Sequence, residues 1–159
     1  MEIFPVFYKK ILESFDEFHL RYLIIGGFAT NFHGVIRTTL DMDLWVDKKG
    51  NNLDNLFESF ISLGYSEESC KQAVDAFTTN HMIKIPFEDN LVEIMDDFIT
   101  KMDFDRTYEN RVVMELGSFY YYVIGMEDLI TMKSKTNRYR DLLDVKELKE
   151  IRNDTNASR

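Results

Sequence analysis

Two aspartates one residue apart, Asp41 and Asp43, lie inside an apolar stretch that otherwise has the pattern of a buried strand. Aspartate is depleted in strands, and residues two apart in a strand project to the same face. Two carboxylates held this close repel each other, and one of them raises its pKa unless a cation is present. Mg²⁺ relieves the repulsion and keeps coordination positions open for phosphate. The alternative is a pair of solvent-facing aspartates on an edge strand, which the apolar flanking residues disfavour.

A glycine pair, Gly26 and Gly27, precedes the aspartates and follows the apolar run Leu23–Ile25. Glycines between a strand and a short helix let backbone N–H groups approach a phosphate closely. Most glycine pairs are only turns, so the pair alone is a weak signal. Together with Asp41 and Asp43 it predicts one site, in which a phosphate lies beside a metal ion.

These residues carry a family resemblance. The arrangement of Ile25-Gly26-Gly27, a spacer of about a dozen residues and Asp41-Met42-Asp43-Leu44 resembles the signature of the DNA polymerase β-like nucleotidyltransferase superfamily. The stretch "RTTLDMDL" is similar to a small bacterial branch that includes the abortive-infection (type IV toxin–antitoxin) nucleotidyltransferases. The later segment "EDLITMKSKTNRYRDLLDVKEL" resembles the same branch through its Leu-Ile-x-x-Lys helix and the Arg-x-x-Asp that follows. The resemblance covers roughly Arg21 to Leu148.

The resemblance implies a third carboxylate on a neighbouring strand, and Glu93 in "NLVEIMDDF" is our candidate. An acidic residue between two apolar strand residues is unusual without a partner. Asp96 and Asp97 are alternatives, which we interpret as residues at the end of the strand or in a turn. Family members more often have Asp at this position, so Glu93 is a departure. It motivates an alternative function, a nucleotide- or protein-binding module with weak catalysis, such as one member of a toxin–antitoxin pair.

The implied activity is that of a Mg²⁺-dependent nucleotidyltransferase. Asp41 and Asp43 would hold two Mg²⁺ ions that bridge the triphosphate of an NTP, and Glu93 would share one ion. Glu93 would also help deprotonate the acceptor hydroxyl, while Gly26 and Gly27 would contact phosphates. The nucleoside monophosphate would pass to a hydroxyl of a small molecule, a protein or an RNA end.

Four further residues are candidates for nucleotide binding: Arg37, Thr38, Lys133 and Asp141. Arg37 either contacts phosphate or neutralises the acidic cluster, and Thr38 stands beside it before the aspartates. Lys133 either binds the triphosphate or is a solvated helix lysine. Asp141 either belongs to the site or forms a surface ion pair with Arg138, three residues away on the same helical face.

His33 and Trp45 each have a functional and a structural interpretation. His33 is either a ligand or, as we favour, a residue at the end of a helix. Trp45 shares strand parity with Asp41 and Asp43, so it either stacks on a base or packs in the core, and we favour packing.

The hydrophobic periodicity predicts one α+β domain over residues 1–152, with a mixed sheet flanked by helices, C-terminal helices that close it and a disordered tail over 153–159. Predicted helices cover Phe4–Phe18, Phe28–Phe32, Asn52–Leu63, Met126–Ser134 and Arg138–Ile151. Predicted strands cover Arg21–Ile25, Asp41–Asp47, His81–Phe87, Leu91–Asp96, Val112–Glu115 and Phe119–Ile124.

Composition limits the partners. The chain has 159 residues and a net charge of −9, which disfavours bulk binding of nucleic acid. A single cysteine, Cys70, fits a reducing compartment, and no apolar run approaches the roughly 20 residues of a membrane span. We therefore expect a cytoplasmic protein. A small transferase has little room for an acceptor site of its own, so a partner protein or a homodimer is plausible.

Overall fold

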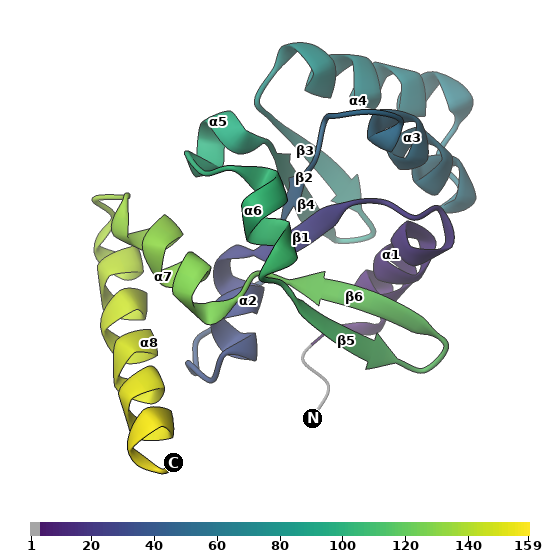
Figure 1. Ribbon diagram of the computed structural model, residues 1–159. Helices are drawn as coiled ribbons and strands as arrows, with labels where there is room; N and C mark the ends of the chain where they lie inside the picture. Colours follow the sequence, from purple (N-terminus) through teal and green to yellow (C-terminus); the bar gives the residue numbers. More distant parts are fainter. Residues whose placement is uncertain (1–3) are drawn as a thin grey trace.

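One six-stranded mixed sheet runs through the molecule in the order β3-β4-β2-β1-β6-β5 (Figure 1). The computed structural model describes residues 4–159. The strands are β1 (Tyr22–Ile25), β2 (Met42–Val46), β3 (Met82–Phe87), β4 (Asn90–Met95), β5 (Val112–Leu116) and β6 (Phe119–Val123). The neighbours β3–β4, β2–β1 and β6–β5 are antiparallel, whereas β4–β2 and β1–β6 are parallel. This mixed sheet flanked by helices confirms the predicted α+β class.

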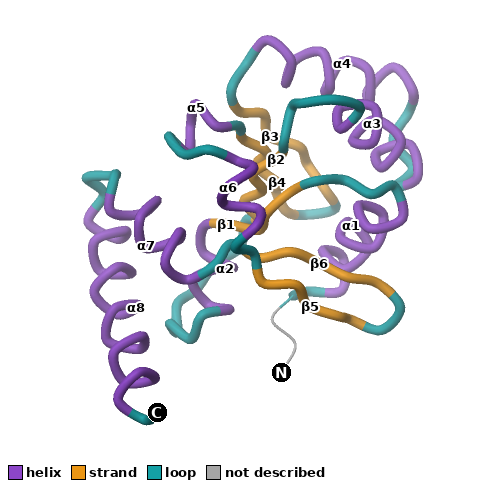
Figure 2. Tube along the Cα trace, viewed as in Figure 1, coloured by secondary structure: helices purple, strands orange, loops and turns teal. Residues whose placement is uncertain are grey.

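Helices pack on both faces of the sheet. They are α1 (Val6–Glu17), α2 (Gly26–Phe32), α3 (Asn52–Ser62), α4 (Glu67–Thr79), α5 (Asp97–Thr100), α6 (Phe104–Glu109), α7 (Met126–Ser134) and α8 (Tyr139–Ala157). Helix α1 contacts β6 and α3, and α3 contacts α4. Helices α7 and α8 pack on each other at the opposite end of the molecule from α3 and α4 (Figures 1 and 2). No helix in residues 4–159 is long and apolar enough to span a membrane.

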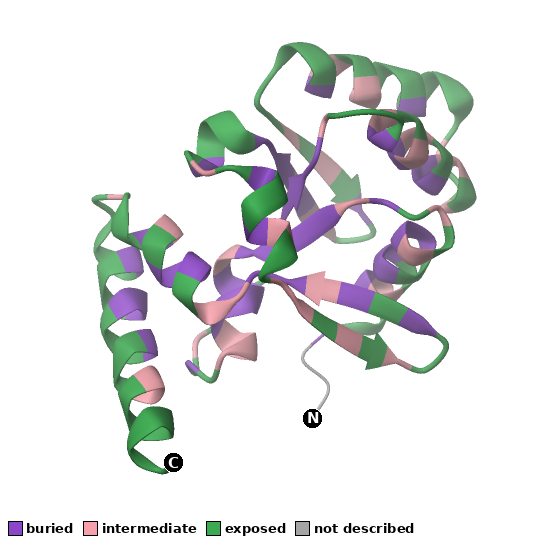
Figure 3. Ribbon diagram, in the orientation of Figure 1, coloured by how far each residue is buried: buried purple, intermediate pink, exposed green. Residues whose placement is uncertain are grey.

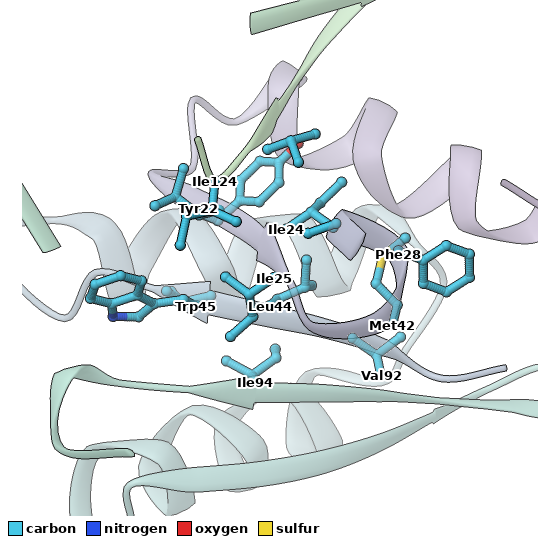
Figure 4. Close-up of a cluster of buried hydrophobic side chains, with 14 of the residues drawn as sticks. Tyr22, Ile24, Ile25, Phe28, Met42, Leu44, Trp45, Val92, Ile94 and Ile124 are labelled. Atoms are coloured by element: carbon cyan, nitrogen blue, oxygen red, sulfur yellow. The ribbon is translucent and has the colours of Figure 1, made fainter. Parts of the chain in front are cut away.

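The core is centred on β1 and β2. All four residues of β1 are buried, and Figure 4 shows Ile24, Leu44 and Ile94 side by side on the adjacent strands β1, β2 and β4. Helix α1 adds a stripe of buried side chains at helical spacing, and its Phe15 ring lies 5.1 Å from that of Tyr22. In Figure 3 the buried residues are concentrated in these central strands and in the helix stripes that face them.

Strand pairing places one polar row on the sheet face opposite to α1. Residues paired across strands share a face, and the pairs Lys84–Glu93, Glu93–Asp43 and Asp43–Ile25 are all in register. The next row is apolar and contains Met82, Met95 and Trp45. Helix α6 covers its Trp45 end, where the Phe104 and Trp45 ring centroids are 5.3 Å apart. The two acidic residues of the polar row therefore stand beside an apolar wall.

The elements differ from the prediction in three places. Helix α4 was missed, although Cys70, Ala73, Val74 and Phe77 follow helical spacing; this short stripe lies among mostly polar residues, and only Cys70 and Phe77 are buried. The short helices α5 and α6 were missed as well. Their capping residues, Asp96 and Asp103, can be recognised in the sequence, but helices of four and six residues are too short to show an apolar repeat. Helix α8 continues to Ala157, into the segment 153–159 for which we predicted a tail.

Candidate active site

Asp43 and Glu93 form the centre of the site. They lie opposite each other on the parallel strands β2 and β4, and their carboxyl groups share a hydrogen bond. On the far side of Glu93, the Nζ atom of Lys84 from β3 lies 3.2 Å from Oε1. The strand parity predicted for Glu93 is confirmed. Its partner is Asp43, a pairing that depends on register and could not be predicted from the sequence.

The electrostatics of this pair favour a bound cation. Burial, the hydrogen bond and charge of Glu93, and the charge of Asp41 together raise the pKa of Asp43 to about 7, while Lys133 acts in the opposite direction. A carboxyl group in this state is half-protonated near neutral pH. A divalent cation between the two carboxylates would remove the repulsion and displace the proton, so the donor set fits Mg²⁺.

Asp41 lies just outside β2 and is exposed, although we predicted it within the strand. The Tyr8 hydroxyl of α1 donates to the carbonyl of Leu40 and thereby fixes the chain as it enters β2. Burial, and then the charge of Asp41, raise the pKa of Tyr8 to about 12. Within residues 4–159, no group of three or more His, Cys, Asp or Glu side chains is arranged to hold a metal ion. The described geometry therefore contains an acidic pair with Asp41 nearby, rather than a preformed set of three ligands.

The two glycines make room for two side chains. A Cβ atom on Gly26, whose φ is +66°, would lie 2.0 Å from Oδ2 of Asp43. A Cβ atom on Gly27 would lie 2.4 Å from Oγ1 of Thr39. Both glycines begin α2, so they are part of the predicted short helix rather than a turn before it. Besides the predicted approach to phosphate, their absent side chains allow Asp43 and Thr39 to reach the start of α2.

Two clefts meet at the acidic pair. The larger has a volume of about 650 Å³ and an apolar wall that includes Met82, Met95, Ile99, Leu129 and Met132. The smaller has a volume of about 400 Å³ and is mostly polar; its lining includes Gly27, Arg37, Thr38, Thr39, Asp41 and Arg140. Asp43, Glu93 and Arg138 line both clefts. A ligand that spans the two clefts must therefore pass the carboxylates.

A buried ion network closes one side of the site. Lys133 Nζ lies 3.1 Å from Oδ1 of Asp141 and 2.9 Å from Oδ2 of Asp144. Arg37 pairs with Asp144, and Arg138 Nε lies 2.7 Å from Oδ2 of Asp141. Burial alone would raise the pKa of Asp141, but hydrogen bonds from Thr136, Lys133 and Arg138 and the charge of Lys133 hold it below its ordinary value.

The network decides between several of the predicted interpretations. Lys133 is 6% exposed and held by two aspartates, so it is not a solvated helix lysine. The predicted Arg138–Asp141 pair is present and joins an exposed arginine, 79% exposed, to an aspartate that is only 3% exposed. Arg37 neutralises Asp144 rather than the Asp41–Asp43 cluster, and its Nε atom is buried without a hydrogen-bond partner in residues 4–159. Because this Nε–H has no acceptor among the described residues, the contact of Arg37 with phosphate stays a prediction.

The remaining candidates have structural roles. His33 ends α2, and its Nε2 atom lies 2.7 Å from the carbonyl oxygen of Ile124. Trp45 is fully buried and donates from Nε1 to Asp97 over 2.9 Å, which confirms the packing interpretation. Asp96 caps α5 at the end of β4, as we predicted for a strand-end residue.

Sequence reasoning missed four residues of the site. Asp144 could have been found from its spacing, since it follows Asp141 by three residues and so lies on the same helix face. Thr39 adjoins the predicted Thr38, whose carbonyl accepts a hydrogen bond from Arg140. Lys84 and Arg140 could be found only from the register of β3 and from the packing of α8 against the 37–40 loop.

Comparisons with known proteins agree on the fold and the family. A family model described as "Nucleotidyltransferase of unknown function (DUF6036)" matches residues 7–157. No curated protein matches the chain significantly. Among solved structures, the chain resembles an antigenic nucleotidyltransferase-like protein from Paracoccidioides brasiliensis, with a TM-score of 0.52 and 14% identity over 89% of this chain and 74% of that chain. At this identity the likeness shows the fold alone.

Proposed function

Because the chain belongs to the DUF6036 family of nucleotidyltransferases, we propose that it moves a nucleoside monophosphate from an NTP to an acceptor hydroxyl with the help of Mg²⁺. One observation carries the proposal. A half-buried acidic pair, Asp43 and Glu93, lies where two clefts meet, and burial together with the neighbouring carboxylates Glu93 and Asp41 raises the pKa of Asp43 to about 7. Such a pair in a cleft is typical of a functional site.

Asp43 and Glu93 would hold the Mg²⁺, with Asp41 beside them. When bound, the ion neutralises charge on the triphosphate and on the pyrophosphate leaving group. Glu93 is also placed to accept the proton of the acceptor hydroxyl, because a carboxylate next to the reacting phosphate can act as a general base.

The two clefts suit different parts of the nucleotide. The smaller cleft is lined by Arg37, Arg138 and Arg140 and suits phosphates, since guanidinium groups bind phosphate oxygens well. The unpartnered Nε atom of Arg37 supports this assignment, because a buried donor without an acceptor is costly. The apolar wall of the larger cleft suits the nucleoside. Lys133 lines the larger cleft and pairs with Asp141 and Asp144, so in this assignment it holds α7 against α8 and makes no contact with the phosphates.

Thermal unfolding with each of the four common NTPs, with and without Mg²⁺, tests the proposal. A ligand that binds the folded state raises its stability, by about 2.7 kcal/mol at 100 times the dissociation constant. We expect a Mg²⁺-dependent rise that disappears in Asp43→Asn and remains in Asp89→Asn, a matched change in the exposed β3–β4 turn. If no NTP stabilises the wild-type protein, the proposal is wrong.

A binding module with weak catalysis is the second candidate. It is favoured by Glu93, where the family that the sequence resembles more often has Asp, and by the competing ion pair of Glu93 with Lys84. Incubation with an NTP labelled at its α-phosphate, together with a small-molecule, protein or RNA acceptor that carries a hydroxyl, separates the two functions. In the module, the NTP binds and stays intact with every acceptor. An active transferase moves the labelled nucleoside monophosphate to an acceptor hydroxyl, releases pyrophosphate and loses this turnover in Glu93→Gln.

The acceptor and the assembly are further proposals. A toxin–antitoxin role requires a partner protein or an acceptor on a protein or RNA, and a dimer could complete the acceptor site. Light scattering during turnover tests the dimer. A monomer with full activity contradicts it.

A further inference from the structure

Thr39 occupies the space that a side chain at residue 27 would fill. The Cβ position of Gly27 lies 2.4 Å from Oγ1 and 2.8 Å from Cβ of Thr39, far closer than real side chains approach. The φ angle of Gly27 lies outside the left-handed range, so the backbone alone does not require glycine there. Glycine at residue 27 is therefore explained by the Thr39 side chain that packs on it.

Thr39 lines a cleft that is rich in donors, with its hydroxyl against the start of α2. Thr39 is half-buried and lines the smaller cleft together with Asp41 and Asp43. Its hydroxyl has no hydrogen-bond partner within residues 4–159, whereas the neighbouring Thr38 exposes its side chain and contributes its carbonyl to Arg140. A hydroxyl held rigidly against the backbone, beside three arginines, is suited to donate to an anionic oxygen.

We propose that Thr39 binds the nucleotide by donating a hydrogen bond to one of its phosphate oxygens, and that residue 27 is glycine in order to admit this side chain. The inference rests on the proposed function, because it places the triphosphate in the smaller cleft. Thr39 then replaces Thr38 as the threonine of the site. It is a binding residue with no part in proton transfer.

Paired substitutions at residue 39 test the hydroxyl. Thr39→Val keeps the branched shape and removes the donor, while Thr39→Ser keeps the donor and removes a methyl group. Because hydrogen bonds to charged groups are strong, we expect Thr39→Val to weaken Mg²⁺–NTP binding about tenfold or more. Thr39→Ser and the distant control Thr78→Val, in α4, should bind like the wild type. Inorganic tripolyphosphate, a probe without a base, should lose affinity in the same variant.

A transplant of the hydroxyl makes the test sharper. Gly27→Ala alone should weaken binding, because its Cβ collides with Oγ1 of Thr39. The double variant Gly27→Ser/Thr39→Gly removes both Oγ1 and Cβ of residue 39, which would otherwise lie within 3 Å of the new Cβ, and returns a hydroxyl to that space from α2. We expect this double variant to bind tripolyphosphate more tightly than Thr39→Gly alone, a rescue that loss of packing would not produce.

The outcomes separate the inference from the function it rests on. Equal affinity of wild type and Thr39→Val, with binding still lost in Asp43→Asn, overturns the inference and leaves the proposed function standing. A larger loss in Thr38→Val than in Thr39→Val also overturns it. If tripolyphosphate binds through Thr39 but no NTP does, the proposed function fails and the inference fails with it, because the cleft then binds polyphosphate and no nucleotide. If neither ligand binds the wild-type protein, both fail.

Discussion

Two acidic pairs near the clefts have opposite electrostatics. Asp141 and Asp144, buried on α8, contact three cations, Lys133, Arg37 and Arg138, and the pKa of Asp141 lies below its ordinary value. Asp43 and Glu93, half-buried on the sheet, contact one cation between them in residues 4–159, Lys84, and the pKa of Asp43 rises to about 7. Burial raises the pKa of both Asp43 and Asp141, and only at Asp141 do hydrogen bonds and positive charge outweigh it.

This contrast separates a structural pair from a functional one. A buried ion pair with all partners present has little left to offer a ligand. An acidic pair short of positive charge is destabilising by itself and gains most from a bound cation. Asp43 and Glu93 therefore lower the stability of the fold when no cation is bound. The Asp141–Asp144 network, by contrast, holds α7 against α8 beside the site.

The largest effect should follow when the network loses its central cation. Lys133→Met leaves Asp141 and Asp144 buried with too few partners, and breaking a buried pair in this way costs about 3–5 kcal/mol. Urea unfolding measures the loss. The control is Lys146→Met, which lies on an exposed face of α8, the helix that carries Asp141 and Asp144. It should change stability by less than about 0.5 kcal/mol. Equal stability of both variants would mean that the network contributes nothing.

The same substitution should have opposite signs in the two pairs. Asp43→Asn removes a carboxylate that is costly to ionise, so without metal it should stabilise the protein by about 1–3 kcal/mol above neutral pH. Asp141→Asn removes the negative charge and one of the two oxygens that accept from Lys133, Arg138 and Thr136, and it should destabilise by a similar amount. Chemical unfolding of both variants at one pH provides the comparison, and equal signs would contradict it.

The pH dependence follows from the direction of each shift. Between the ordinary pKa of Asp, about 4, and about 7, folded Asp43 holds more protons than the unfolded chain, so its contribution to stability falls as pH rises. For Asp141 the folded pKa is lowered, so its contribution is present above the ordinary value and is lost as pH falls. The advantage of Asp43→Asn over wild type should therefore grow from about pH 5 to about pH 8.

The acidic pair of the sheet was visible in the sequence for a simple physical reason. A strand has a period of two, so Asp43 and Glu93 stand out between apolar neighbours that face the core. The pairing of Asp43 with Glu93, and of Glu93 with Lys84, required the register of strands that are far apart in the chain. Periodicity within one element carries no information about that register.

The network was harder to predict. It joins Arg37 to Asp144 across 107 positions of the chain, and a helix lysine such as Lys133 has the same local pattern whether it is solvated or buried. The glycines were predicted to share one site with Asp43, the residue that Gly26 contacts, but the contact of Gly27 with Thr39 was not predicted, because a glycine does not indicate which side chain packs on it. Helix α4 was missed because its apolar stripe is short and lies among mostly polar residues.

A smaller effect is expected for Mg²⁺ binding itself. The ion must displace the proton shared by Asp43 and Glu93, so its affinity should rise as pH increases through about 7. We expect a threefold to tenfold gain, on the order of 1 kcal/mol, between about pH 6 and about pH 8. Calorimetry in two buffers of different ionisation enthalpy would also detect the released proton. A pH-independent affinity would place the ion elsewhere, and Glu93→Gln should abolish the dependence.

The smallest effect should come from Lys84, the lysine that contacts Glu93 of the acidic pair on the sheet. Lys84 Nζ lies 3.2 Å from Oε1 of Glu93, but its side chain is 55% exposed, and exposed pairs contribute roughly 0–1 kcal/mol. Lys84→Met should therefore barely change unfolding in urea, in contrast to Lys133→Met. Because Lys84 competes for the carboxylate that would bind Mg²⁺, its loss should strengthen Mg²⁺ binding a few-fold. If Lys84→Met instead destabilises as strongly as Lys133→Met, the two acidic pairs are equivalent, and the lack of positive charge at Asp43 no longer marks the functional one.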